Sequence, residues 1–162
     1  MGAAPVGPIR PAWLHVRSVS SYAPVVRTWK PERSTWTDPR SGVEVTQWTH
    51  YKGHSHHFYF TNPGWWDGGR RLLFGSDREG RTNLFSLDLA DGGITQLTDS
   101  DMPPPPAETS FLFACVNPTR DEAYYWRGPD LIAIDLPTGR ERTLGRAPDS
   151  CMDGRMRRRS CL

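Results

Sequence analysis

Three segments of the 162-residue chain repeat one pattern, and their Asp residues, Asp38, Asp88 and Asp135, stand 50 and 47 positions apart. Each segment is a short β-prone run that ends in Asp, a tight turn that ends in Gly, and a second β-prone run. The segments are TWTDPRSGVEVTQWT (35–49), LFSLDLADGGITQLT (84–98) and LIAIDLPTGRERTL (131–144). A repeat of this length with several short strands is typical of β-propeller blades. Blades occur in closed rings, because a single blade cannot bury both faces of its sheet.

The sequence therefore predicts an all-β fold, a β-propeller fragment with about two four-stranded blades and an N-terminal closing hairpin. The hairpin is expected at 34–37 and 43–49. The strands of the first blade are expected at 56–61, 71–76, 83–88 and 94–98, and those of the second at 111–116, 122–126, 131–135 and 141–144. In propellers the first strands often complete the last blade and so close the ring.

Composition divides the chain into three parts. Residues 1–28 are rich in Pro, Ser and Ala and are expected to be a disordered leader, although a start codon placed too early would look the same. Residues 29–149 are the partial propeller. Residues 150–162 have a basic composition unlike anything upstream, which favours a truncated or frame-shifted reading frame over a genuine basic tail. On this view the chain is part of a larger protein.

The charge and the cysteines exclude several classes of function. A formal net charge of +2 gives no general argument for binding nucleic acid or a membrane surface. No segment has the apolar length of a transmembrane helix or the core of a signal peptide. Three cysteines suggest neither a disulfide framework nor a zinc spacing. A cytoplasmic setting is therefore expected.

The densest group of functional side chains is HSHH, which contains His54, His56 and His57. In a four-stranded meander, the connection into the first strand and the connection between strands two and three emerge at the same end. The histidines are therefore expected beside Arg78 and its neighbours Asp77, Arg81 and Asn83, at the end where propellers usually bind small ligands. His54, His56, His57 and Arg78 are the predicted substrate-binding residues.

Each of these residues also has a structural interpretation. The histidines can hydrogen-bond loop backbone instead of serving as ligands or proton carriers. Arg78 can stabilise its own turn instead of binding a carboxylate. Trp65 and Trp66 belong to the opposite end of the blade, where blade packing is favoured over a platform for a sugar. No complete catalytic signature is present, so the residues themselves identify no catalytic group.

A family resemblance rests on two stretches of the chain. The run from DPRSGVEVTQWTHYKGHSHHFYFTNPGWWDGG to LADGGITQLTD resembles the opening of bacterial oligogalacturonate lyases. ETSFLFACVNPTRDEAYYWRGPDLIAIDLPTGRERTL resembles their next blade. The similarity covers about 29–149. The HSHHFYFTNPGWWDGG segment is more particular to this group, whereas SDREGRTNLFSLDLADGGITQLT is also similar to Tol-type propellers.

The resemblance implies a seven-bladed propeller that cleaves short oligogalacturonides by β-elimination in pectin degradation, in the cytoplasm. It implies a histidine base and a manganese site of histidines and a glutamine, in blades expected beyond the C-terminus of this chain. The chain alone is therefore expected to hold no metal and to be inactive. The alternative is a non-catalytic, Tol-type interaction scaffold. Because two blades leave apolar flanks open, self-association through the blade edges is expected as well.

Overall fold

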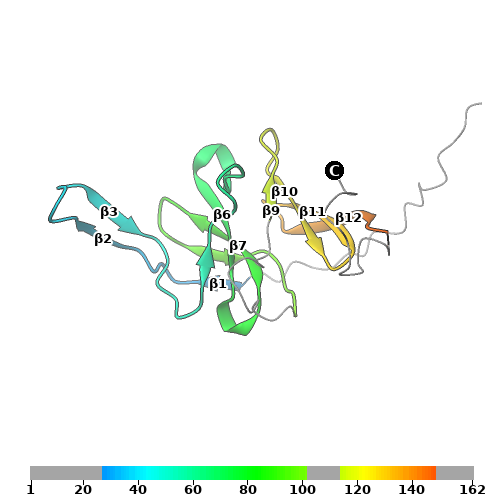
Figure 1. Ribbon diagram of the computed structural model, residues 1–162, viewed down its shortest axis with the longest axis horizontal. Helices are drawn as coiled ribbons and strands as arrows, with labels where there is room; N and C mark the ends of the chain where they lie inside the picture. The colour runs from blue at the N-terminus through cyan, green and yellow to red at the C-terminus, as the bar shows by residue number, and fades with distance from the viewer. Residues whose placement is uncertain (1–26, 102–113, 149–162) are drawn as a thin grey trace, which may run out of the picture.

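The computed structural model describes residues 27–101 and 114–148, and these residues are almost entirely β-structure (Figure 1). The strands are β1 (Arg27–Trp29), β2 (Ser34–Thr37), β3 (Glu44–Gln47), β4 (Ser55–His56), β5 (Trp65–Trp66), β6 (Arg71–Ser76), β7 (Asn83–Asp88), β8 (Ile94–Gln96), β9 (Ala114–Val116), β10 (Glu122–Arg127), β11 (Asp130–Asp135) and β12 (Arg140–Arg146). Two short 3-10 turns, η1 (Asp67–Gly69) and η2 (Arg78–Gly80), lie between strands. Within these two stretches, no helix has the length and apolarity that a membrane crossing requires.

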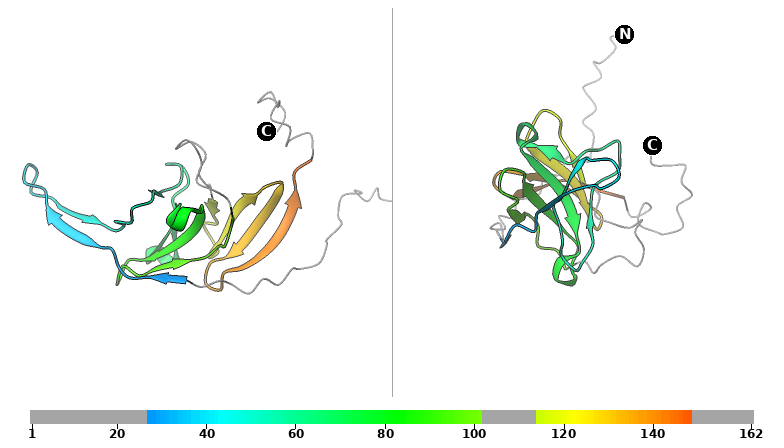
Figure 2. Two further views of the ribbon diagram at one scale, coloured as in Figure 1. Left: turned by 90° about the horizontal axis from the view of Figure 1, so that it is seen from below. Right: turned by 90° about the vertical axis from the view of Figure 1, so that its left-hand side faces the viewer.

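The strands form three antiparallel sheets that follow one another along an arc (Figure 2). The hairpin β2–β3 stands alone at one end of the arc. The first blade has the order β1-β8-β7-β6-β4, and β5 also pairs with β6. The second blade has the order β12-β11-β10-β9. The predicted all-β propeller fragment of two blades and a hairpin is confirmed.

The repeated Asp-turn-Gly pattern forms the same turn in all three sheets. The backbone N–H of Gly42, Gly92 and Gly139 donates to the carbonyl of the Asp four residues earlier, at 2.9, 2.8 and 2.7 Å. All three glycines have a left-handed backbone, with φ of 70°, 80° and 67°, which explains why the pattern ends in Gly. The Asp side chain also accepts from the backbone of its own turn, as in Ala90 N to Asp88 Oδ1 at 2.9 Å. Each repeat therefore carries its own turn signal.

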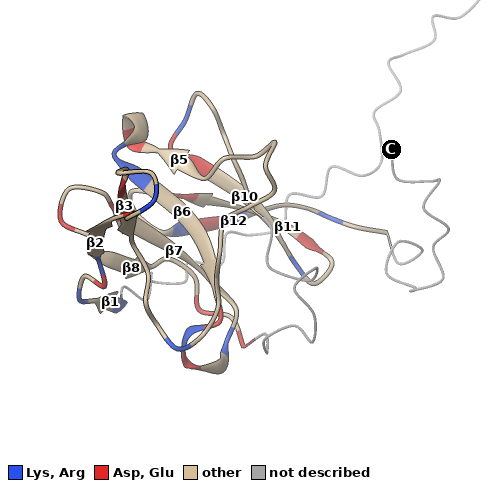
Figure 3. Cartoon of the chain, turned by 60° about the vertical axis from the view of Figure 1, so that its left-hand side comes forward, with Lys and Arg blue, Asp and Glu red and all other residues tan. Residues whose placement is uncertain are grey.

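Side chains on alternate positions of the strands pack into two separate apolar clusters. Leu73 and Leu84 belong to one cluster with Ile134 of the second blade, and all three side chains are inaccessible to solvent. Phe74 and Phe85 point to the other face of the first blade. Figure 3 shows the charged residues gathered mainly at turns and loops, which leaves the central strands of both blades apolar. The period-two alternation thus builds one core between the blades and one on the outer flank.

The predicted first strand of the first blade, 56–61, is wrong in its extent. Two short strands, β4 and β5, both pair with β6, and the chain leaves the sheet between them. Phe58 turns into the core between the blades, and Asn62 Nδ2 donates to Ala114 O at 2.5 Å. The detour therefore links the two blades, which a local strand pattern does not reveal.

The boundary of the predicted leader is also too late in the chain. Arg27 and Thr28 form β1 together with Trp29, and this strand pairs with the outer edge of β8. The Trp29 ring packs edge-on against Phe85, with 5.4 Å between ring centroids. Three residues are too few to show a period, and the contact lies across the sheet. Residues 1–26, the prolyl loop 103–106 and the tail 150–162 lie outside the described residues.

Candidate substrate-binding site

The carboxylate of Asp77 orients the side chain of His54 at one end of the first blade. His54 precedes β4 and Asp77 follows β6, so the antiparallel pairing of these strands brings the two residues together. The Asp77 N–H donates to His54 O at 3.2 Å, and His54 Nδ1 lies 3.1 Å from Asp77 Oδ2. The side chain of His54 is 70% exposed, whereas that of Asp77 is 9% exposed. A buried carboxylate thus holds an imidazole that stays open to solvent.

The backbone around the pair fits this arrangement closely. Ser76 Oγ donates to His54 O at 2.7 Å, which fixes the chain just before β4. A Cβ at Gly53 would lie 2.5 Å from Asp77 Oδ1, so a larger residue there would push the carboxylate out of its position. The residues that precede His54 and Asp77, namely Gly53 and Ser76, therefore help to hold the His54–Asp77 pair in place.

The other two histidines have different surroundings. The His56 ring lies 5.7 Å from the His54 ring, centroid to centroid, so the two share one face as their alternate positions predict. His57 Nδ1 lies 3.1 Å from Phe58 O, and its ring is directed to local backbone. The structure thus brings His54 and His56 together and leaves His57 apart.

The guanidinium of Arg78 is engaged inside the protein. It forms a two-pronged ion pair with Glu32, in which Nη2 lies 3.1 Å from Oε2 and Nη1 contacts Oε1. Its side chain has no exposed surface, and the carboxylate of Glu32 is 16% exposed. The rings of Tyr51, Phe85, Trp29 and Phe74 surround the cation at 4.9–6.0 Å. Arg78 is near the histidines in the fold, but its charge faces Glu32 rather than solvent.

Glu32 is the charged partner of Arg78, and the sequence did not indicate it. Glu32 lies 46 residues before Arg78, in a connection without any repeat or motif. Its carboxylate also accepts from the His50 N–H at 2.7 Å, so it ties three segments of the chain together. A lone Glu in a loop gives no local signal of such a role.

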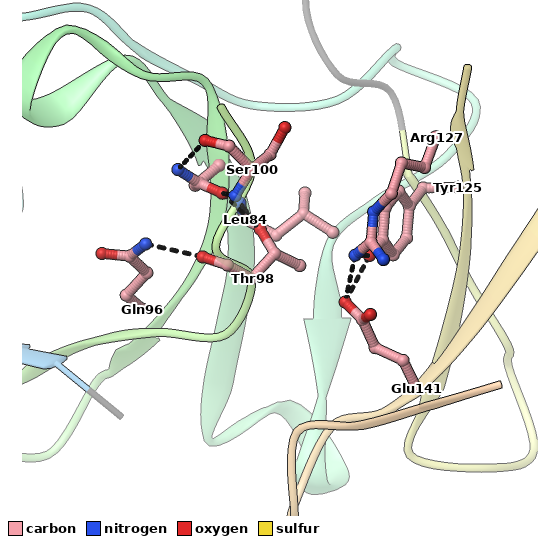
Figure 4. Close-up of polar contacts among 8 residues, drawn as sticks. Leu84, Gln96, Thr98, Ser100, Tyr125, Arg127 and Glu141 are labelled. Atoms are coloured by element: carbon pink, nitrogen blue, oxygen red, sulfur yellow. Dashed lines mark hydrogen bonds and ion pairs between the residues drawn. The ribbon is translucent and has the colours of Figure 1, made fainter. Parts of the chain in front are cut away.

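Polar contacts fix the chain where it leaves β8, at the same end of the blade (Figure 4). Thr98 Oγ1 accepts from Leu84 N–H at 2.9 Å, and Gln96 Nε2 donates to Thr98 O at 2.6 Å. Asn83 Oδ1 accepts from both the Thr98 hydroxyl and the Ser100 N–H. Asn83, which the sequence placed beside the histidines, therefore serves the backbone of this connection.

A second polar group in Figure 4 belongs to the second blade. Tyr125 OH donates to Glu141 Oε1 at 2.5 Å, and Arg127 Nη2 reaches the same oxygen at 2.6 Å. Burial and the Glu141 carboxylate together raise the pKa of the Tyr125 hydroxyl well above its ordinary value. This tyrosine stays protonated at physiological pH and acts as a hydrogen-bond donor, not as a base.

The described residues do not fit a manganese site. Within 27–101 and 114–148, no group of three or more His, Cys, Asp or Glu side chains is arranged to hold a metal ion. His54, His56 and Asp77 cluster without meeting this requirement.

The Glu32–Arg78 pair predicts how stability responds to pH. Burial alone would raise the pKa of the Glu32 carboxyl, but hydrogen bonds from Arg78 and from the His50 amide outweigh it and lower the pKa below its ordinary 4.5. Because the folded pKa is the lower one, the contribution of Glu32 is complete above pH 4.5 and is lost as the pH falls through the folded pKa. In urea unfolding, the stability gap between wild type and Glu32→Gln should narrow from pH 6 to pH 3. A gap that stays constant or widens would contradict this assignment.

The repeated Asp turns, the meandering four-stranded sheets and the core between them define the chain as an arc of β-propeller blades. Two curated relatives are similar to it over 116 residues, an oligogalacturonide lyase of Pectobacterium atrosepticum (31% identical) and an oligogalacturonate lyase of Dickeya dadantii (30% identical). Each match covers 71% of this chain and 28% of the relative, so the chain spans little more than a quarter of their length. No family model matches the chain.

Solved structures agree with the sequence relatives. An oligogalacturonate lyase in complex with manganese superposes with a TM-score of 0.64 at 28% identity, over 75% of this chain and 31% of that one. An oligogalacturonate lyase of Vibrio parahaemolyticus gives the same TM-score at 22% identity, which supports the fold alone. The resemblance to the oligogalacturonate lyase family is therefore confirmed, over part of the length of its members.

Proposed function

We propose that these blades belong to a lyase that acts on short oligogalacturonides by β-elimination in pectin degradation, in the cytoplasm. The observation that carries the proposal for this chain is the exposed His54 imidazole held by the buried Asp77 carboxylate. The lyase names of the relatives support the reaction class. Because the chain spans about a quarter of those relatives, its part in the reaction is proposed to be substrate binding.

The geometry gives His54 a defined chemical form. An ionised carboxylate only accepts hydrogen bonds, so Nδ1 carries the proton that faces Asp77. In the neutral ring, Nε2 then offers a lone pair to a sugar hydroxyl, and in the protonated ring it donates to a uronate carboxylate. Both groups occur on each galacturonate unit. His54 is therefore proposed to bind and orient the substrate, with His56 beside it.

The elimination itself needs further groups. A base removes the C5 proton, the C4–O4 bond breaks as the C4–C5 double bond forms, and the leaving oxygen takes a proton. A cation must stabilise the charge that develops on the uronate carboxylate. We propose that the base and the manganese are supplied by blades other than the two described. The isolated chain should then form no unsaturated uronate from digalacturonate when Mn²⁺ is added, as measured by the absorbance of that product. Any turnover would overturn this division of roles.

The binding role of His54 is tested by titrating the full chain with digalacturonate. His54→Gln and Asp77→Asn should each weaken binding at this end about ten-fold, or roughly 1.4 kcal/mol, because either change removes or misorients the imidazole. His50→Gln is the matched control, since the His50 ring is exposed and contacts Gln47 instead. Unchanged affinity in both His54→Gln and Asp77→Asn would sink the proposed site.

A further inference from the structure

A cleft lies between the two blades, at the end of β6 opposite to His54. It encloses about 360 Å³ and is lined by Trp65, Trp66, Asn117, Thr119, Arg120 and Asp121, among others. β5 pairs with the first residues of β6 and β4 with its last, so the six residues of β6 separate the two sites by roughly 17 Å. A ligand in the cleft therefore does not contact His54.

The two tryptophans of the cleft have different roles. Trp66 is 5% exposed and belongs to the core between the blades, whereas the adjacent Trp65 is 49% exposed. Neighbouring strand positions face opposite sides, so only one of the two rings can serve the core. Gly68 and Gly69 also line the cleft, and no atom of the described residues lies within 4 Å of where a Cβ would stand on either, so the cleft is open at this turn. Packing accounts for Trp66 but not for Trp65.

Acidic and basic side chains line the cleft together with Trp65. Asp121 Oδ1 accepts from the Asp67 N–H at 2.9 Å, which joins the loops of the two blades and leaves its second carboxylate oxygen available. The Asp67 carboxylate is held by Arg70 and Arg71. Arg120 forms no ion pair with any residue of the described stretches, although it lines the cleft. Trp66 Nε1 is buried without an acceptor among those residues.

We infer that this cleft binds an acidic sugar unit at a site separate from the His54 end. The exposed indole of Trp65 matches the apolar face of a pyranose ring. The Arg120 guanidinium matches a uronate carboxylate in two-pronged fashion, and the Asp121 carboxylate matches ring hydroxyls. A neutral sugar would use the ring and the hydroxyl partners but not Arg120. The inference rests on the proposed function only for the choice of galacturonate as the probe.

Calorimetric titration of the full chain with digalacturonate tests the cleft. The wild type should bind two equivalents, and Trp65→Ala and Arg120→Gln should each weaken one of them at least ten-fold while the other is unchanged. Both side chains are exposed, so far-UV circular dichroism and the urea midpoint should match the wild type. Galactobiose, which lacks carboxylates, should bind the cleft at least ten-fold more weakly than digalacturonate.

The outcomes separate this inference from the proposed function. The proposed cleft site would be refuted if Trp65→Ala and Arg120→Gln both bound two equivalents of digalacturonate with wild-type affinity. It would also be refuted if the wild type bound no digalacturonate. Equal affinity for galactobiose would overturn its assignment to an acidic sugar. His54→Gln should weaken the other equivalent only. If it weakens neither, the His54 site fails and the cleft stands.

Discussion

Glu32→Ala is expected to destabilise the protein by about 3–5 kcal/mol, because it leaves the fully buried Arg78 guanidinium without a carboxylate. The surrounding rings of Tyr51 and Phe85 attract the cation but do not replace two charge-assisted hydrogen bonds. The loss would be seen as a lower urea midpoint with an unchanged slope. Because Glu32 also holds the His50 amide, the connection into β4 should loosen first.

Two variants separate this effect from the loss of charge alone. Glu79→Ala breaks the pair with Arg27, in which both side chains are 53% exposed, and should cost at most about 1 kcal/mol. In the double variant Glu32→Ala, Arg78→Met the unpaired buried charge is gone, so much of the stability should return. If Glu32→Ala lowers the free energy of unfolding by less than about 1 kcal/mol, or if the double variant recovers none of it, the Glu32–Arg78 pair does not stabilise the fold as proposed.

The sheets could be predicted from the sequence because their signals are local. The turn that begins at Asp88 and ends at Gly92 lies within five residues, and the same pattern recurs at Asp38 and Asp135. β6 and β7 have the predicted ends, since each is a short run dominated by apolar side chains between turn-rich connections. Wherever the residues that set a structure are neighbours in the chain, the pattern is visible before the fold is known.

The structures that escaped prediction depend on contacts between distant residues. Phe58 leaves the predicted strand because its ring is buried against the second blade. β1 forms on the outer edge of β8, where a three-residue strand gains its partner from the sheet. No period or turn residue marks either event. In both places, packing against residues distant in the chain outweighs the local preference, and the local sequence does not show that packing.

The candidate site also has features that the sequence predicts and features that depend on distant residues. The end of the blade at which His54 and Arg78 meet follows from meander topology, and the alternate positions of His54 and His56 follow from the strand period. The direction of the Arg78 side chain does not, because its partner Glu32 is 46 positions away. Exposure also separated Trp65 from Trp66, two residues that the sequence treats alike. Topology placed the residues, and long-range partners decided which of them face solvent.

Gly64→Ala is the second large effect that we expect, at about 3 kcal/mol, because the new methyl group would overlap a buried strand. An added Cβ would lie 2.1 Å from the carbonyl oxygen of Leu73, in the middle of β6, where no flexible side chain can yield. The same glycine accepts from the Leu73 N–H at 2.7 Å, so separating the two backbones would break that bond as well. The detour between β4 and β5 would be displaced with it, and Phe58 would lose its place between the blades.

Gly68→Ala is the matched control, four residues further along the chain, in the η1 turn that follows β5. There the penalty is conformational, since φ is 61° with no atom within 4 Å of the new methyl group, and about 1 kcal/mol is expected. Urea unfolding gives the two free energies, and amide hydrogen exchange reports the Leu73 N–H directly. Gly64→Ala should speed exchange at Leu73 while Gly68→Ala leaves it unchanged. Equal costs, or a Leu73 amide that stays protected in both variants, would mean that Gly64 does not hold the detour against β6.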